Sequence, residues 1–171
     1  REVKGLIQLA QEGYVDIAAV GNEVMYREDL TEDELLDYIS DAKALIPEGI
    51  PVGYVDAYYE FRDRPRISEM VDVILANCYP FWEGCAFDYS LLYMKNMYQQ
   101  AQNAGKGKKV IITETGWPSR GKSLRDAHAS EANARNYFIN TQLWSTSENI
   151  DIFYFSSFDE SWKVGPEGDV G

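Results

Sequence analysis

The sequence has little of the chemistry from which metal centres and disulfide frameworks are built. It contains a single histidine, His128, and two cysteines, Cys78 and Cys85, which flank the segment YPFWEG. Two thiols cannot supply the four ligands of a structural zinc site, and the histidine has no obvious partner residue. A disulfide across this short loop is one alternative in a secreted protein. We favour two buried or half-buried free thiols.

Basic residues are also scarce. The 16 Lys and Arg residues are outnumbered by 28 Asp and Glu residues, which gives a net charge of −12. A nucleic-acid-binding protein needs clustered Lys and Arg side chains to neutralise phosphates. Here the basic residues are scattered, and the tight group Lys106, Lys108 and Lys109 fits a solvated turn before a strand. We therefore expect no nucleic-acid partner.

Long hydrophobic runs and a leader sequence are missing as well. The apolar runs are far shorter than the ~20 residues that a membrane-spanning helix needs, so we expect no membrane segment in this chain. The first residue is Arg1 rather than Met, and no signal peptide is present. The sequence therefore indicates a processed or excised piece, and it leaves the oligomeric state open.

What is present is a globular composition with a regular order of elements. Of the 171 residues, 45% are hydrophobic and 26% are charged, which suits one domain with a substantial core. Five apolar segments predict strands at residues 15–20, 50–55, 73–78, 109–113 and 152–156. Helical patterns precede and separate these segments at residues 1–11, 31–47, 67–71, 88–104 and 130–147. Alternating strands and helices predict an α/β fold with a parallel sheet.

Two architectures fit this order. An open doubly wound sheet needs a phosphate-binding glycine loop, and neither G-x-G-x-x-G nor G-x-x-x-x-G-K occurs in the sequence. A (β/α)8 TIM barrel instead places its chemistry at the carboxyl ends of the strands, where polar residues accumulate here. Such a barrel takes about 250 residues, so 171 residues correspond to five of its eight units. We expect one catalytic domain over residues 1–171, a partial barrel whose leading strands and closing helix are missing.

Polar side chains follow each predicted strand. The segment VGNEV ends the first strand on Asn22 and Glu23, and VIITETGWPS ends the fourth on Glu114. The other strand ends carry Asp56, Asn77 with Tyr79, and Asp159 with Glu160. Cleavage of a glycosidic bond needs two such carboxyl groups, one as acid and one as base or nucleophile. The polar strand ends therefore fit a glycosidase site.

Each of these residues also has a plainer interpretation. A glutamate at a strand end is often a solvated loop residue, and tryptophans and tyrosines most often belong to the core. Glu160 and Lys163 fit an exposed ion pair that contributes little to stability. Several acidic strand ends in one chain, accompanied by aromatic rings, weaken these plainer interpretations, but spacing alone leaves them about level with a sugar-binding cleft.

Four motifs carry a resemblance to a known family. In this order, VGNEV, NCYPFW, ITETGWPS and FDESWK resemble glycoside hydrolase family 17, the β-1,3-glucanases of a large clan of retaining glycosidases. The chain is most similar to the microbial branch, over essentially all 171 residues. The resemblance implies a (β/α)8 barrel of which this chain covers about strands four to eight. It also implies a secreted, periplasmic or cell-surface protein.

The resemblance implies roles for particular residues. Glu23 matches the general acid/base, Glu114 the nucleophile, and Asn22 the amide that bonds the 2-hydroxyl of the sugar. Tyr79 matches a tyrosine that holds the nucleophile in place, and Asp159 stands where plant members have Asn. The remaining substrate-binding candidates are the strand-end residues Asp56 and Asn77, the aromatic residues Phe81, Trp82, Trp117 and Trp162, and the pair Glu160 and Lys163.

These roles imply a retaining hydrolase that cleaves β-1,3-glucan polysaccharides or oligosaccharides by double displacement, with neither metal nor organic cofactor. A β-1,3-glucanosyltransferase is the nearest alternative, because the acceptor in the second step decides between the two. An inactive glucan-binding fragment, or a piece of a larger membrane-associated glucan synthase system, is a third. Loss of one glutamate would mark a non-catalytic binder, yet both are present.

Overall fold

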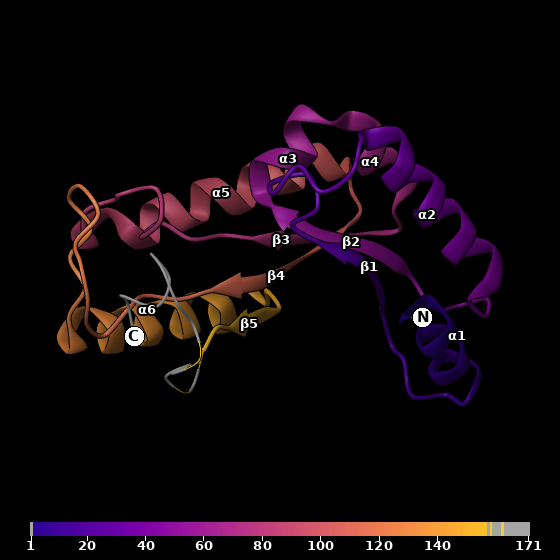
Figure 1. The fold of residues 1–171 in the computed structure, drawn as a ribbon. Coiled ribbons are helices and arrows are strands. Elements are labelled where there is room, and N and C mark those ends of the chain that lie inside the picture. The colour runs from indigo at the N-terminus through magenta and orange to yellow at the C-terminus, as the bar shows by residue number, and fades with distance from the viewer. Residues whose placement is uncertain (1, 157, 159–161, 163–171) are drawn as a thin grey trace. The chain divides into compact units, whose positions relative to one another are not determined.

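The computed structural model describes residues 2–156, 158 and 162 (Figure 1). Strands and helices alternate along these residues. In chain order they are α1 (Glu2–Gln11), β1 (Ala18–Asn22), α2 (Glu32–Leu45), β2 (Val52–Ala57), α3 (Tyr58–Asp63), α4 (Pro65–Met70), β3 (Val73–Asn77), the 3-10 helix η1 (Phe87–Tyr89), α5 (Ser90–Gly105), β4 (Lys109–Thr115), α6 (Glu131–Glu148) and β5 (Ile152–Tyr154).

The five strands form one sheet in the order β1-β2-β3-β4-β5. β1 pairs with β2 in parallel, and β4 pairs with β5 in parallel. The predicted α/β class with a parallel sheet is therefore confirmed. Among the described residues, no helix combines the length and apolar character that crossing a membrane requires.

The chain divides into two compact units. The first unit contains Arg1–Ala76 and Gln99–Ile111, and the second contains Asn77–Tyr98 and Ile112–Gly171. The prediction of a single catalytic domain over residues 1–171 stays a prediction.

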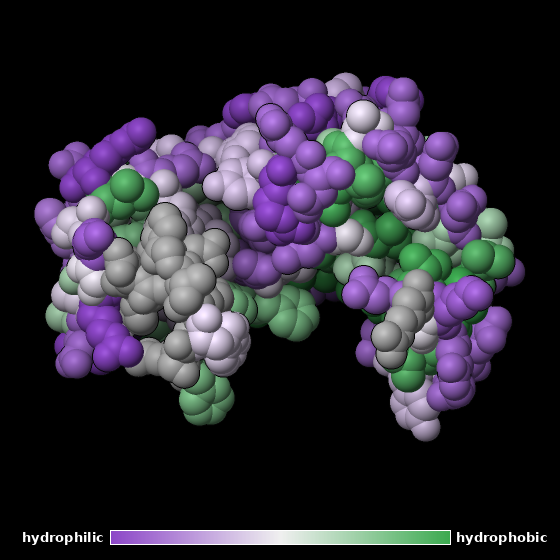
Figure 2. Space-filling model, in the orientation of Figure 1, coloured by the Kyte–Doolittle hydropathy of each residue, from purple (hydrophilic) through white to green (hydrophobic). Residues whose placement is uncertain are grey.

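In the first unit, α2 begins with a capping box, which the pattern Thr31-Glu32-Asp33-Glu34 in the sequence predicts. The hydroxyl of Thr31 accepts a hydrogen bond from the amide of Glu34 at 3.3 Å, and the Glu34 carboxylate accepts one from the amide of Thr31 at 2.8 Å. Two amides that the helix leaves without partners are thereby satisfied. The helix buries Leu35 and Ile39 on its inner side, and hydrophilic residues cover much of the outer surface of this unit's helices (Figure 2).

The core of the first unit depends on a close approach of β2 to β3. Val73, Leu75 and Ile111 form a buried cluster against which Ile17 and Val55 pack. A Cβ atom at Gly53 would lie 2.7 Å from the Leu75 side chain and 2.8 Å from that of Val73. Glycine is therefore required at this position of β2, because larger residues would push β3 away.

The connection between β2 and β3 contains two short helices, where the sequence predicts one over residues 67–71. The structure has α4 slightly earlier and adds α3, which the sequence pattern does not predict. Pro65 opens α4, and Arg64 before it has φ −125° and ψ 73°. A residue that precedes proline is held out of the helical region, so the helix breaks at Arg64 and restarts.

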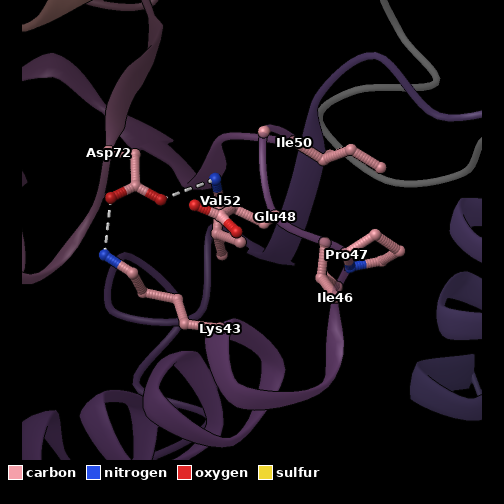
Figure 3. A pocket seen from close by; sticks show the side chains of 8 residues that line it. Lys43, Ile46, Pro47, Glu48, Ile50, Val52 and Asp72 are labelled. Atoms are coloured by element: carbon pink, nitrogen blue, oxygen red, sulfur yellow. Dashed lines mark hydrogen bonds and ion pairs between the residues drawn. The ribbon is translucent and has the colours of Figure 1, made fainter.

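A pocket of about 180 Å³ lies in the first unit where β2 begins (Figure 3). Asp72 is one of the lining residues and joins two others. One of its carboxylate oxygens accepts a hydrogen bond from Lys43 Nζ at 2.5 Å, and the other accepts one from the amide of Val52 at 3.0 Å. The pocket therefore sits at the amino ends of β2 and β3. In barrel enzymes that end contributes stability, and the chemistry lies at the other.

The second unit packs around a cluster of aromatic rings. The Trp117 ring lies 5.3 Å from Phe81, 5.7 Å from Phe87 and 5.5 Å from Tyr137, measured between ring centroids. Cys78 is buried and Cys85 half-buried, and both are free thiols, as favoured from the sequence. Burial raises the pKa of both thiols, which makes them poor nucleophiles.

The lysines before β4 do not all lie in solvent. Lys108 is half-buried, and its Nζ donates to the carbonyls of Ser68 at 2.6 Å, Glu69 at 2.8 Å and Val71 at 2.6 Å. These carbonyls belong to the end of α4, so Lys108 acts as a carboxyl-terminal cap. Lys106, by contrast, makes an exposed ion pair with Glu69.

The two lysines allow a matched test of this cap. We expect Lys108→Met to lower the free energy of unfolding by about 2 kcal/mol, because hydrogen bonds to a charged donor contribute ~1.5–3 kcal/mol. Lys106→Met should change it by less than about 0.5 kcal/mol, as is usual for an exposed ion pair. Urea denaturation followed by circular dichroism measures both. Equal effects of the two substitutions would contradict the capping role.

Candidate active site

Glu23 follows an irregularity at the end of β1. Between the partner pairs Ala19↔Gly53 and Asn22↔Val55, β1 advances three residues while β2 advances two. The extra residue is a β-bulge, a feature that often re-aims a side chain beside an active site. Gly21 has φ 85° and Glu23 has φ 53°, so the backbone turns sharply and Glu23 holds a conformation that non-glycine residues rarely adopt.

The surroundings of Glu23 in the first unit are polar and partly open. Its amide donates to the carbonyl of Val55 at 2.8 Å, and its side chain remains about one-quarter exposed. Arg27 lies one turn further along, with Nη1 at 3.8 Å from Glu23 Oε2 and Nη2 donating to the carbonyl of Asn22 at 2.6 Å. The carboxylate is therefore held at the strand end and is accessible to a ligand. Arg27 is not among the residues predicted from the sequence.

Asp56, at the end of β2, lies differently from what the sequence suggests. It is predicted to contact substrate, but the structure buries it completely. Its carboxylate accepts hydrogen bonds from the amides of Met25, Tyr26 and Ala57 and from the Tyr54 hydroxyl. A side chain used in this way does not face a ligand. Tyr54 is a member of this group that sequence reasoning missed.

Glu114 lies in the second unit, at a second irregularity. Between the pairs Ile112↔Ile152 and Thr115↔Tyr154, β4 advances three residues while β5 advances two. Glu114 sits inside this extra length of β4. Its carbonyl accepts from the amide of Cys78 at 2.9 Å, and its carboxylate accepts from the hydroxyl of Tyr79 at 2.9 Å. The structure thus joins Tyr79 to Glu114, the arrangement that the family resemblance implies.

Asn77, the other predicted amide, is buried. Its side-chain oxygen accepts a hydrogen bond from Thr113 Oγ1 at 2.8 Å, one residue before Glu114. This bond ties the end of β3 to the end of β4 beside the Tyr79–Glu114 pair. The structure therefore supports a positioning contact for Asn77, and its substrate-binding role stays a prediction.

The predicted sugar-stacking rings divide into two groups. Phe81 and Trp117 are buried, and Trp117 Nε1 donates to the carbonyl of His128 at 2.9 Å, so both serve packing. Trp82 is 41% exposed and lies edge-on to Phe81, and Trp162 is 72% exposed. Exposed tryptophan faces can stack on sugars, so Trp82 and Trp162 are the better candidates. Glu160 and Lys163 lie outside the described residues, as does Asp159.

The described part of the chain contains no group of three or more His, Cys, Asp or Glu side chains that could hold a metal ion. The functional groups described at the two strand ends are carboxyl groups, a phenol and amides. These groups can donate and accept protons, and an ionised carboxylate can act as a nucleophile.

A family model, the BtgE/BtgC glycoside hydrolase domain, matches residues 1–171. The chain belongs to this family. Glucan 1,3-beta-glucosidases of Arthroderma benhamiae and Candida albicans are each 31% identical to this BtgE/BtgC domain, over 96% and 90% of its length. These matches cover 58% and 56% of the two relatives, so the chain spans little more than half of their length.

Solved structures agree with the family. The crystal structure of the glycoside hydrolase family 17 β-1,3-glucanosyltransferase from Rhizomucor miehei matches the BtgE/BtgC domain with a TM-score of 0.89 and 35% identity. The match covers 99% of this chain and 65% of that one. An endo-laminarinase from Formosa has a TM-score of 0.79 at 21% identity, which supports the fold alone. The resemblance to family 17 seen in the four motifs is confirmed, and the roles of individual residues stay predictions.

The Tyr79–Glu114 contact allows a test with a built-in control. Tyr93 donates to Glu83 Oε2 at 2.6 Å in the same unit, a second tyrosine–glutamate pair whose hydrogen bond raises the pKa of Tyr93 to about 12. We expect Tyr79→Phe to lower kcat/KM on laminari-oligosaccharides by about 10- to 100-fold, the equivalent of one hydrogen bond to a charged group. Steady-state kinetics of the full-length protein measure this.

Tyr93→Phe removes the same kind of hydrogen bond from Glu83 and should leave kcat/KM within about twofold, because neither residue has a predicted role in the reaction and exposed substitutions usually have small effects. A loss of equal size in both variants would mean that Tyr79 matters to the fold and not to Glu114.

Proposed function

We propose that this BtgE/BtgC domain is the catalytic part of a retaining glycosidase that acts on β-1,3-glucan. The observation that carries the proposal is the pair of β-bulges. Glu23 follows one, Glu114 lies in the other, and each bulge is at the carboxyl end of a parallel strand. The similarity to glucan 1,3-beta-glucosidases and to a β-1,3-glucanosyltransferase supports the same substrate class.

In the proposed first step, ionised Glu114 attacks the anomeric carbon of a glucosyl residue. The bond from that carbon to the leaving oxygen breaks, and Glu23 gives its proton to this oxygen. A covalent glycosyl-enzyme forms on Glu114. The Tyr79 hydroxyl, which donates to Glu114 Oε2, keeps one carboxylate oxygen in place while the other reacts.

In the second step, Glu23 acts as a base. It takes a proton from the acceptor, whose oxygen attacks the anomeric carbon and releases Glu114 with overall retention of configuration. Water as the acceptor gives hydrolysis, and a sugar hydroxyl gives transfer. A retaining site needs its two carboxyl groups about 5–5.5 Å apart. We propose a secreted, periplasmic or cell-surface location, since polymeric β-1,3-glucan is too large to enter a cell.

A test of Glu114 can separate its chemistry from its place in the fold. We expect Glu114→Ala to abolish cleavage of laminari-oligosaccharides, and azide to restore turnover of a substrate with an activated leaving group by attacking in its place. The product should be a glycosyl azide of inverted configuration, identified by NMR. Glu83→Ala is the matched control, because Glu83 is also held by a tyrosine. No azide product with Glu114→Ala would place the nucleophile elsewhere.

Transfer is the alternative that a specific observation favours, because the Rhizomucor miehei enzyme is a glucanosyltransferase at 35% identity. Chain-length analysis of products from laminari-oligosaccharides distinguishes the two reactions. We expect products longer than the substrate at high substrate concentration, since exposed Trp82 offers a face on which an acceptor sugar can stack. Products that are shorter at every concentration would establish hydrolysis alone.

A further inference from the structure

A buried tyrosine–aspartate pair in the first unit has no part in the proposed chemistry. Tyr54 and Asp56 lie two residues apart on β2, so both side chains project from the same face of the strand. Both are completely buried, and the Tyr54 hydroxyl donates to Asp56 Oδ2. Burying an ionisable group is costly unless its partners repay the lost hydration. The partners of this pair are therefore informative.

The other hydrogen bonds of this pair within the described residues are with backbone amides, and two of these amides belong to the turn after Glu23. Asp56 Oδ2 accepts from the amides of Met25 at 3.1 Å and Tyr26 at 3.3 Å. The amide of Met25 also lies 2.9 Å from the Tyr54 hydroxyl. The other carboxylate oxygen accepts from the amide of Ala57 at 2.7 Å. Two side chains of β2 thus bind the backbone two and three residues beyond Glu23.

The turn needs such partners. Residues 23–29 form a hydrogen-bonded turn in which Arg27 donates to the carbonyl of Glu23 at 2.9 Å and Asp29 to that of Val24 at 2.9 Å. As at the start of a helix, the first amides of such a turn have no partner within the turn. Asp56 and Tyr54 supply those partners from the neighbouring strand, so the start of the turn cannot rotate without breaking their hydrogen bonds.

Glu23 itself is held from the same strand. Its amide donates to the carbonyl of Val55, which lies between Tyr54 and Asp56. Glu23 has φ 53°, a backbone conformation that costs a non-glycine residue about 1–2 kcal/mol and that persists only where the surroundings enforce it. Three consecutive residues of β2 therefore fix the backbone at Glu23 and beyond it.

We propose that Tyr54 and Asp56 are positioning residues for the acid/base Glu23, holding the turn so that its carboxyl group can reach the leaving oxygen of the glycoside. This inference rests on the proposed function. A positioning role of this kind differs from the substrate contact that the sequence suggests for Asp56. It predicts a loss confined to the steps that need proton transfer by Glu23.

The test compares two substrates of the full-length protein. One is a laminari-oligosaccharide, whose leaving sugar must be protonated; the other is a 2,4-dinitrophenyl β-laminaribioside, whose leaving group needs no proton. A positioned general acid contributes about 10²–10⁴-fold, so Glu23→Ala should lower kcat/KM on the first substrate by that amount and spare the second. Asp56→Asn and Tyr54→Phe should show the same selectivity, with a loss of about 10- to 100-fold on the oligosaccharide and under about threefold on the aryl substrate.

Asp72→Asn is the matched control. Asp72 also accepts a hydrogen bond from a backbone amide of β2, that of Val52, but at the amino end of the strand (Figure 3). It should lower the midpoint of thermal unfolding without changing the ratio of the two kcat/KM values. In a Glu23→Gln background, Asp56→Asn should cause no further loss on the oligosaccharide. Tyr54→Phe decides the question if Asp56→Asn does not fold, since it keeps the buried ring.

If Asp56→Asn and Tyr54→Phe lowered kcat/KM equally on both substrates, the ratio of the two values would be that of the unmodified protein. That result would overturn the positioning role while leaving the proposed function intact. Failure of the unmodified protein to cleave either substrate would overturn the proposed function, and this inference with it.

Discussion

The register of the parallel strands decides where the two glutamates point. Side chains alternate between the faces of a strand, so a shift of one residue moves every later side chain to the opposite face. β1 and β4 each contain one residue more than the neighbouring stretch of their partner strand. That single residue sets which way Glu23 leaves β1 and which way Glu114 leaves β4. Without it, the same sequence would present the neighbouring residues in their place.

A bulge loosens the ladder of backbone hydrogen bonds, and polar side chains form further hydrogen bonds beside both bulges. In the first unit, Tyr54 and Asp56 bind the amides that follow Glu23. In the second, Thr113 binds Asn77, and Tyr79 binds Glu114 itself. Each predicted catalytic carboxylate is thus accompanied by hydrogen bonds from an adjacent strand or the loop after it. Such support is what a preorganised site needs, because mobile carboxylates would lose alignment with the reacting bond.

The sequence predicts the parts of this structure that depend on local pattern. Five apolar segments give the strands, Thr31 and Glu34 give the start of α2, and the acidic strand ends single out Glu23 and Glu114. The break at Arg64 was missed, although the proline after it is a visible signal. Which rings are exposed could not be predicted, because Phe81 and Trp82 are adjacent in sequence and differ only in how the second unit packs around them. Tyr54 was missed for a related reason: within an apolar strand, a tyrosine is indistinguishable from a core residue until its hydroxyl finds a partner.

At position 23 the side chain that the proposed chemistry needs belongs to a residue that the left-handed backbone disfavours. Glycine would occupy φ 53° without steric cost, yet glycine carries no proton to give. The protein retains the residue that its backbone disfavours, and the strain is compensated by the neighbouring strand. Selection for thermal stability alone, without selection for activity, would therefore favour glycine at this position and give a more stable but inactive protein. At position 23, a gain in stability would therefore come with a loss of catalytic activity.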